Sequence, residues 1–503
     1  MNYQCTRNQT DRVTAAQAMV QGIAKDGGLF VPETFPQYTH TDFAKMQNST
    51  YIERAEKILA DFLPEFTAEA IAECVQAAYA KEKFSGGDPA PITTVQNDTL
   101  TMYVLELWHG PTCAFKDMAL QLLPHLLTHS LKITNCDKTA VILVATSGDT
   151  GKAALEGFKD VDKTQMLVFY PENGVSPMQK RQMNTQEGAN VSVCAIQGNF
   201  DDAQTGVKRI FTNAEICSKL EENGMTFSSA NSINWGRLLP QIVYYFSAYC
   251  DLLKSGAVKA EGEPINIVVP TGNFGNILAA YYAKKMGLPV HKLICASNSN
   301  NVLTDFLRTG VYDRNRPFHT TISPSMDILI SSNLERLLYD ITGNNAQQVA
   351  QWMQQLARTG RYEIDAQTLE KIQSVFAADY CSDQTTEQTI AQVYCSTRYL
   401  CDTHTAVAVN AYEQYVKETG DQTPTIVVST ASPYKFADAV LKAVSEHYNS
   451  VEDEFDKVHR LSEETETPIP APIAVLQSKP VRFRNICTPQ TMPDELLKLL
   501  GLR

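Results

Sequence analysis

The segment PTGNFGNILAAYYAKKMG, residues 270–287, contains the groups best suited to binding a phosphate. A short apolar run ends at Pro270, and a turn with two glycines, Gly272 and Gly275, leads into a helical pattern. Consecutive backbone N–H groups at the start of a helix bind anions, and glycines allow close approach because they lack a Cβ. We therefore expect a phosphate loop here, with an ordinary strand-to-helix turn as the alternative. Its residues are Gly272, Asn273, Phe274, Gly275 and Asn276.

Lys116 is the second chemically informative residue. It lies in ELWHGPTCAFKDMALQ, between a Gly-Pro turn and an apolar helical segment, and its neighbours Phe115 and Met118 indicate partial burial. A lysine removed from water can form an imine with an aldehyde. The alternative is a lysine that begins a helix and pairs with Asp117.

A third loop, TSGDTGKAAL, offers the hydroxyl groups of Thr146, Ser147 and Thr150 at the start of a helical pattern, which suits a carboxylate ligand. Its Gly-Lys pair invites comparison with a nucleotide-binding P-loop. That motif needs a glycine where this chain has Thr146 and a serine or threonine where it has Ala153, so an ATPase is not indicated. The phosphate loop likewise lacks the G-x-G-x-x-G spacing of dinucleotide sites.

Each of these loops borders a predicted strand or helix. Short β-branched runs that alternate with amphipathic segments indicate parallel sheets covered on both faces, so the fold class is α/β. Ligands of such folds bind beyond the carboxyl ends of the strands. Helical spacing at 14–24, 51–62 and 67–83 predicts a helical N-terminal unit. The predicted strands are 140–146, 166–170, 191–196, 265–270 and 425–430.

Composition excludes several classes of protein. The 503 residues are 44% hydrophobic and 20% charged, as in an ordinary globular protein of about two to three domains. A net charge of −13 disfavours binding to nucleic acid. No apolar run approaches the length of a membrane span, and the N-terminus lacks a hydrophobic signal, so we expect no membrane association and a cytoplasmic location. The twelve cysteines show no metal-ligand spacing, so we expect no metal site.

Eight strings, in order along the chain, together resemble the threonine synthases, and most closely the long form with an extra N-terminal domain. These strings are DGGLFVP from Asp26, HGPTCAFKD from His109, ATSGDTG from Ala145, SANSINWGRLLPQ from Ser229, PTGNFGN from Pro270, SPSMDI from Ser323, HTAVA from His404 and STASPYKF from Ser429. The resemblance implies a fold-type-II, tryptophan-synthase-β-like enzyme that uses pyridoxal phosphate. It would have two parallel-sheet α/β domains around a cofactor cleft and a mainly helical N-terminal domain.

The resemblance also implies roles for individual residues. Lys116 would be the catalytic lysine that binds the cofactor covalently, residues 272–276 would bind the cofactor phosphate, and Thr430 would lie beside the pyridine nitrogen. Asp149 would lie near O3′ of the ring. The substrate carboxylate and phosphate would be bound by Thr146, Ser147, Gly148, Thr150, Ser232, Asn234 and Arg237. A planar arginine fork suits a phosphate dianion, with a surface ion pair as the alternative for Arg237.

The implied reaction converts O-phosphohomoserine and water into L-threonine and phosphate. The nearest rival is a serine or threonine dehydratase of the same fold type, and a rival of another class is a catalytically silent homologue. We expect a helical N-terminal domain at 1–95, a smaller mobile domain at 96–245 and a large domain at 246–503, in a monomer or homodimer. Two departures from the family pattern are Thr403, where proline is common, and Cys5, where serine is usual. His404 is therefore given no firm role.

Overall fold

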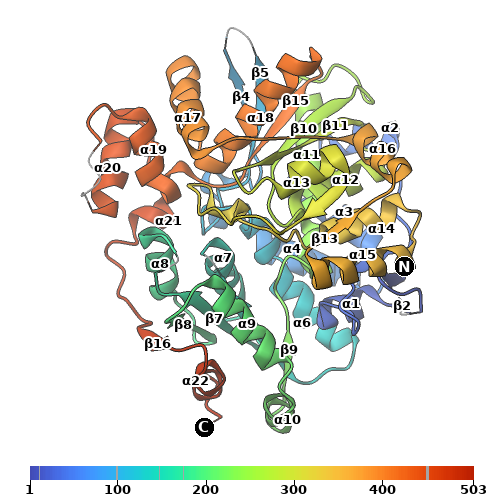
Figure 1. Cartoon of the computed structure of the whole chain (residues 1–503), viewed down its shortest axis with the longest axis vertical. Helices are drawn as coiled ribbons and strands as arrows, with labels where there is room; N and C mark the ends of the chain where they lie inside the picture. Colours follow the sequence, from blue (N-terminus) through green and yellow to red (C-terminus); the bar gives the residue numbers. More distant parts are fainter. Residues whose placement is uncertain (11, 98–99, 147, 174, 449–452, 503) are drawn as a thin grey trace.

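The computed structural model describes residues 1–503 except 11, 98–99, 147, 174, 449–452 and 503. Two largely parallel β-sheets lie in the upper and lower halves of the molecule as viewed in Figure 1, with helices around both. This arrangement confirms the predicted α/β class. The helices of the N-terminal segment lie beside the larger sheet and contribute to the same core (Figure 1).

The lower sheet has five parallel strands in the order β16-β8-β7-β6-β9. Alternate residues of its strands face opposite sides: Ile142 packs with α6 and α7, whereas Val141 and Leu143 pack with α9, α10 and α22. The strands are β6 (Thr139–Ala145), β7 (Thr164–Pro171), β8 (Val191–Ile196), β9 (Met225–Ser228) and β16 (Asn485–Cys487). The helices are α6 (Leu123–Ile133), α7 (Asp149–Phe158), α8 (Pro177–Asn184), α9 (Phe200–Phe211), α10 (Ala214–Glu222) and α22 (Met492–Leu499).

The upper sheet has six strands in the order β14-β11-β10-β15-β5-β4, all parallel except the β4–β5 pair. Val268 and Val427 face α17 to α19, whereas Ile267 and Ile426 face α11 and α12. The strands are β4 (Ile92–Gln96), β5 (Thr101–Glu106), β10 (Ile265–Pro270), β11 (Val290–Ser297), β14 (Phe376–Tyr380) and β15 (Thr425–Ser429). The helices are α11 (Trp235–Ser255), α12 (Gly275–Lys285), α17 (Asp383–Thr397), α18 (Thr403–Thr419) and α19 (Ala437–Val444).

Further helices and strands lie around the upper sheet. They include α5 (Asp117–Leu120), α13 (Val302–Thr309), β12 (Val311–Asp313), α14 (Leu334–Ile341), α15 (Ala346–Thr359), β13 (Arg361–Glu363), α16 (Ala366–Val375), α20 (Glu454–Thr465) and α21 (Ala471–Ala474). Single 3-10 turns are η1 (Lys81–Lys83), η2 (Ser85–Gly87), η3 (Pro324–Met326) and η4 (Pro433–Phe436).

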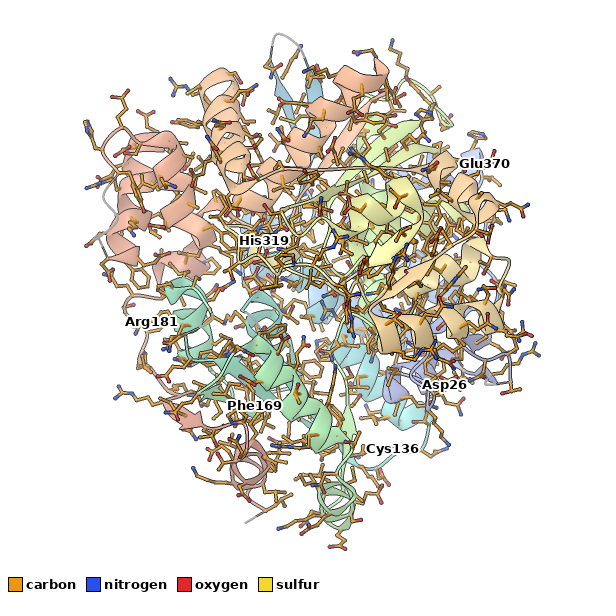
Figure 2. The ribbon with its side chains drawn as sticks, viewed as in Figure 1. Asp26, Cys136, Phe169, Arg181, His319 and Glu370 are labelled. Carbon is orange, nitrogen blue, oxygen red and sulfur yellow. The ribbon has the colours of Figure 1, made fainter. Side chains whose placement is uncertain are left out.

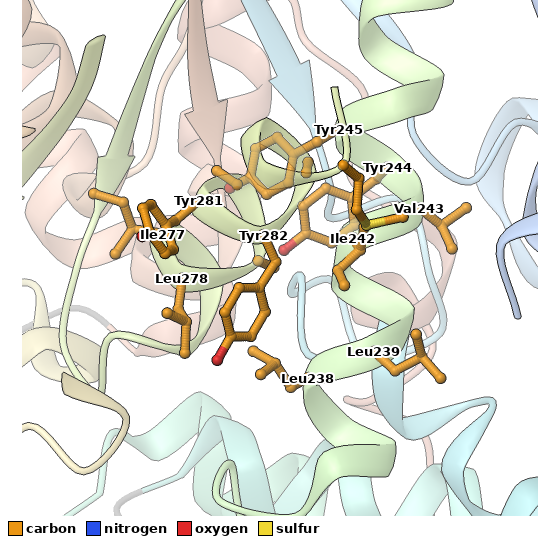
Figure 3. Close-up of a cluster of buried hydrophobic side chains, with 14 of the residues drawn as sticks. Leu238, Leu239, Ile242, Val243, Tyr244, Tyr245, Ile277, Leu278, Tyr281 and Tyr282 are labelled. Carbon is orange, nitrogen blue, oxygen red and sulfur yellow. The ribbon is translucent and has the colours of Figure 1, made fainter. Parts of the chain in front are cut away.

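The N-terminal segment contains the predicted helices and also a small antiparallel sheet, β2-β1-β3, which the sequence analysis did not predict. Its aromatic side chains join those of α11 and α12 in one buried cluster, of which Figure 3 shows Tyr244, Tyr245 and Tyr282. Its elements are β1 (Tyr3–Cys5), β2 (Arg12–Val13), α1 (Ala15–Gln21), β3 (Phe30–Pro32), α2 (His40–Met46), α3 (Tyr51–Phe62) and α4 (Ala68–Tyr79). This cluster holds α11 and α12 firmly against the upper sheet.

Neither of the two large sheets is formed by one contiguous segment of the chain. β4 and β5 lie within residues 96–245 or just before them, yet they pair in the upper sheet with β15. β16 lies near the C-terminus and pairs with β8 in the lower sheet. The division at residues 95 and 245 therefore stays a prediction, and a division by sheets would join segments that are distant in sequence.

Gly157 sets how closely α7 approaches the segment that follows Lys116. A Cβ added at Gly157 would overlap the backbone carbonyl oxygen of Leu120 at the end of α5. Gly206 in α9 is also helical, but there the added Cβ would meet the flexible side chain of Met492. The contact at Gly157 is with a backbone atom of Leu120, so it can be relieved only if α5 shifts.

We expect Gly157→Ala to lower the free energy of unfolding by about 3 kcal/mol, because overpacking against a backbone atom forces a helix to shift. Gly206→Ala, the matched control, should cost less than about 1 kcal/mol because the Met492 side chain can turn away. Urea unfolding of both variants measures the difference. Equal stability of the two variants would show that α7 does not constrain α5.

Candidate active site

Lys116 lies at the junction between the two sheets. It directly precedes α5, its side chain is buried, and its Nζ donates a hydrogen bond to Ser325 Oγ at 2.9 Å. Asp117 accepts hydrogen bonds from the backbone N–H and the hydroxyl of Thr112 at 2.8 and 2.7 Å. The alternative in which Lys116 pairs with Asp117 is therefore not what this structure has.

Asp149 lies between two ammonium groups. Its Oδ1 is 2.7 Å from Lys435 Nζ, and its Oδ2 is 3.5 Å from Lys116 Nζ. Lys435 is fully buried and also donates to the carbonyl oxygen of Thr112 at 3.0 Å. Gln179 donates to Asp149 Oδ1 at 3.1 Å. Because Lys435 is the nearer partner, the amine of Lys116 is not committed to a tight ion pair.

These contacts shift the titration of both groups. Burial lowers the pKa of Lys116 to about 8; the charge of Asp149 opposes this, while those of Lys435 and Arg237 add to it. Burial alone would raise the pKa of Asp149, but the charges of Lys435 and Lys116 outweigh it and hold the pKa well below its usual range. Near neutral pH, a useful fraction of Lys116 is therefore the uncharged amine, facing an ionised carboxylate.

Residues 272–276, the predicted phosphate loop, form the turn that leads into α12. Phe274 adopts φ of +64° as the N-cap of α12, and the helix begins at Gly275. Ser331 Oγ donates to the carbonyl oxygen of Gly272 at 2.8 Å, and the N–H of Asn333 to that of Asn273 at 3.1 Å. Among the described residues, none accepts a hydrogen bond from the backbone N–H groups of 272–276. These donors at a helix N-terminus fit a phosphate.

Lys116 and Gly272 both lie close to Ser325. A Cβ at Gly272 would lie 2.7 Å from the carbonyl oxygen of Ser325, so only glycine allows this approach. The N–H of Phe115 donates to the carbonyl oxygen of Thr430 at 2.8 Å. Thr430, predicted to lie beside the pyridine nitrogen, is thus close to the segment that contains Lys116. The side-chain oxygen of Asn276 bonds within the protein rather than facing a ligand, because it accepts hydrogen bonds from Tyr244 and Tyr245 at 2.5 Å.

Arg237 is a buried cation without a carboxylate partner. Its Nη1 donates to the carbonyl oxygen of Ala230 at 2.6 Å, its Nε has no partner, and no ion pair to it is found in the part of the chain that the structure describes. Burial lowers its pKa to about 10. The guanidinium therefore remains charged at neutral pH in a site that supplies no counter-charge. The alternative for Arg237, a surface ion pair, is not found among the described residues, and an anionic ligand would satisfy the guanidinium.

The other predicted substrate residues divide into two groups. Asn234 is the N-cap of α11, the helix that contains Arg237; its Oδ1 accepts from Gly236, and its Nδ2 donates to the carbonyl oxygens of Met19 and Ser229. Thr146 Oγ1 accepts from the N–H groups of Gly148 and Gly151 at 3.0 and 2.9 Å. These side chains hold the helix starts in place.

Thr150 and Ser232 are half-buried and remain available to a ligand. Gly148 has φ of +138°, and a Cβ there would overlap Gln179, so the turn into α7 requires glycine. Ser147 lies outside the described residues. The roles of all these residues stay predictions.

No role was predicted from the sequence for four residues around the site: Lys435, Ser325, Gln179 and Asp402. His404 Nδ1 is 2.7 Å from Asp402 Oδ2, and its Nε2 accepts from the N–H of Ser325 at 3.2 Å, so the imidazole holds the Ser325 loop. Thr403 occupies the first position of α18, where proline is favoured in helices generally. Lys435 and Ser325 both lie in strings that carry the family resemblance. That resemblance is the sequence signal from which a role for them could have been predicted. Only the fold brings them to Lys116.

Sequence models of three families match successive parts of the chain. They are the threonine synthase N terminus at residues 2–79, the pyridoxal-phosphate dependent enzymes at 87–378 and the threonine synthase C-terminal region at 405–491. The chain belongs to the threonine synthase family. Its fold is that of the fold-type-II pyridoxal-phosphate enzymes, and its cofactor is pyridoxal phosphate.

Relatives and solved structures agree with this assignment. Threonine synthase from Pseudomonas aeruginosa is 39% identical over 444 residues, which are 88% of this chain and 90% of the relative. Threonine synthase-like 1 from Homo sapiens is 42% identical over 85% of this chain, but the chain spans only 58% of that relative. A pyridoxal-phosphate-bound threonine synthase from Brucella melitensis has a TM-score of 0.86 at 36% identity over 99% of both chains. The yeast threonine synthase has a TM-score of 0.88 at 32% identity over 100% and 99%.

The described residues contain no group of three or more His, Cys, Asp or Glu side chains arranged to bind a metal ion. In the same residues, no helix combines the length and apolar character that crossing a bilayer requires. Three features of this structure fit the family's cofactor. They are the backbone N–H groups of residues 272–276 that lack partners, the buried Lys116 and the close contact that Gly272 allows.

Replacing Lys435 by methionine should raise the pKa of Lys116 above its value of about 8. The change removes a positive charge that lowers this pKa and leaves the whole charge of Asp149 to Lys116. The fraction of neutral amine at pH 7.5 then falls several-fold. The pH dependence of Lys116 acetylation by acetic anhydride, followed by mass spectrometry of cofactor-free protein, measures this.

Lys152→Met is the matched control, because Lys152 is also buried but its Nζ pairs with Glu156 at 2.9 Å. The acetylation midpoint of Lys116 should stay the same in this variant. An unchanged midpoint in Lys435→Met would show that Lys435 does not influence Lys116.

Proposed function

We propose that the protein is a threonine synthase that converts O-phosphohomoserine and water into L-threonine and phosphate. The observation that carries this proposal is the buried guanidinium of Arg237, which has no carboxylate partner among the described residues and lies close enough to Lys116 to lower its pKa. A phosphorylated substrate would supply the missing charge. The names of the relatives support the same assignment.

In this proposal, Lys116 would hold the cofactor covalently, and residues 272–276 would bind its phosphate through their N–H groups. Asp149, which Lys435 keeps ionised, and Thr430 would contact the ring of the cofactor. When bound, pyridoxal phosphate stabilises negative charge that develops at Cα and Cβ of the substrate. The neutral amine of Lys116 would take the Cα proton of the substrate, and its pKa of about 8 suits this role near neutral pH.

Arg237, Ser232 and Thr150 would bind the phosphate of the substrate, while Thr146, Ser147, Gly148 and the start of α7 would receive its carboxylate. Asn234 would act indirectly, because it caps the helix that positions Arg237. Over the whole reaction, phosphate leaves Cγ, which gains a proton, and Cβ exchanges a proton for the hydroxyl of water. The released phosphate remains beside Arg237, where it can orient the attacking water.

The site is expected to exclude bulk water during the reaction, because water would otherwise divert the substrate to a keto acid. The segment around Thr146, which belongs to the lower sheet, is the proposed moving part. A cytoplasmic location and a monomeric or homodimeric state remain predictions.

Incubation with O-phosphohomoserine should release phosphate and form an equal amount of L-threonine, measured by a phosphate assay and amino-acid analysis. The rival dehydratase would instead form a keto acid from unphosphorylated serine or threonine. A silent homologue would do neither. Formation of keto acid without threonine would contradict the proposal.

Arg237→Met should lower kcat/KM for O-phosphohomoserine by about 100-fold, since loss of a charge-assisted contact with phosphate costs on the order of 3 kcal/mol. Arg308→Met is the control, because Arg308 is half-exposed and pairs with Asp379 at 3.1 Å away from Lys116. Steady-state kinetics of both variants, with thermal unfolding to verify folding, test the assignment. If Arg237→Met reacts as Arg308→Met does, Arg237 is not in the phosphate site.

A further inference from the structure

A cavity of about 850 Å³ lies at the end of the lower sheet opposite Lys116. Residues 135–137 and 160–163 line it, and these immediately precede β6 and β7, whereas the Thr146 loop follows β6. Because β6 has seven residues, roughly 20 Å of strand separate the two places. Cys136, which lines the cavity, is labelled at the lower edge of the molecule in Figure 2. The wall also includes Pro111, five residues before Lys116, but none of the predicted site residues lines the cavity.

Two helices connect the cavity with that site. α7 begins at Asp149 and its last turns contribute Glu156 and Gly157 to the cavity wall. Gln121, which caps the C-terminus of α5, also lines the cavity, and Lys116 caps the N-terminus of the same helix. The cavity thus shares helices with the candidate site but none of its side chains.

One part of the wall offers two lysines, Lys83 and Lys132, that form no ion pair with a described residue. Lys83 is half-buried, and its Nζ donates to Gln121 Oε1 at 3.1 Å. Burial lowers the pKa of Lys83, and the nearby charge of Glu156 opposes this shift. Neither Lys83 nor Lys132 has an ion-pair partner among the residues that the structure describes. The buried Nε2 of Gln121 also has no acceptor. These donors suit a carboxylate ligand.

Another part of the wall offers negative charge. Asp160 and Asp162 are exposed in the loop before β7, and neither forms an ion pair with a described residue. Asp160 Oδ1 accepts a hydrogen bond from the N–H of Ala189 at 2.7 Å, which fixes its position. Carboxylates in this arrangement suit an ammonium group. Val161, Cys136 and Pro111 line the cavity, are half-buried and provide apolar surface, whereas Leu131 is buried in the core.

We propose that this cavity is a second ligand site, which binds a small zwitterion with an apolar side chain, the class of the apolar α-amino acids. The ligand carboxylate contacts Lys83, its ammonium group contacts Asp160 and Asp162, and its side chain lies against Val161 and Cys136. The volume exceeds that of one amino acid, so a short peptide of the same class also fits. The proposal concerns binding alone and does not depend on the reaction proposed above.

Titration of the holoenzyme with L-leucine, L-isoleucine, L-valine and L-methionine, each followed by isothermal titration calorimetry, tests the proposal. At least one should bind saturably with one site per chain. Lys83→Met should weaken that binding at least tenfold. Lys81→Met is the matched control, because Lys81 is an exposed lysine of the same 3-10 turn that does not line the cavity, and it should leave the binding unchanged.

Asp162→Asn should also weaken binding. Because Asp162 is exposed, this variant should fold and can test the proposal if Lys83→Met does not fold. Parallel titrations with acetate and inorganic phosphate identify the ligand class. Binding of these anions alone, with dependence on Lys83, would replace the zwitterion by a simple anion. No saturable binding by any of the four amino acids, or binding that both cavity variants leave unchanged, would overturn the proposal.

Discussion

The ionised carboxylate of Asp149, buried between Lys435 and Lys116, is the contact on which the arrangement of the site depends. Asp149 begins α7 of the lower sheet, whereas Lys435 follows β15 and Lys116 follows β5 of the upper sheet. One carboxylate therefore joins the two halves of the molecule at the point where their loops meet. Buried charge pairs contribute little net stability, but removing one partner leaves a costly unpaired charge. The pair therefore fixes geometry and charge more than it stabilises the fold.

This geometry also explains why the amine of Lys116 is available for chemistry. Lys435 is the nearer partner of Asp149, so the positive charge that the carboxylate requires is supplied by a lysine that is fully buried and also bound to Thr112. Lys116 keeps only the longer contact and a hydrogen bond to Ser325. Burial and the neighbouring cations then lower its pKa, as a nucleophilic amine near neutral pH requires.

Much of this could be predicted from the sequence because the signals are local. The apolar runs that became β6, β7, β8, β10 and β15 are long enough to show strand character, and the glycine turn at Gly272 precedes an evident helix. Strands of two or three residues, such as β1 and β16, show no such pattern, and β16 forms only by pairing with β8. Lys435 and Ser325 lie hundreds of residues from Lys116, and no spacing rule connects them. The cavity near Lys83 likewise exists only once α6 and α7 have packed.

We propose that Lys116, and not the adjacent buried Lys435, binds the cofactor. Incubation of the protein with pyridoxal phosphate, reduction with sodium borohydride and peptide mapping by mass spectrometry test it directly. The account predicts one phosphopyridoxyl group per chain, located on Lys116. A label on Lys435, or labels scattered over exposed lysines with Lys116 unmodified, would contradict it.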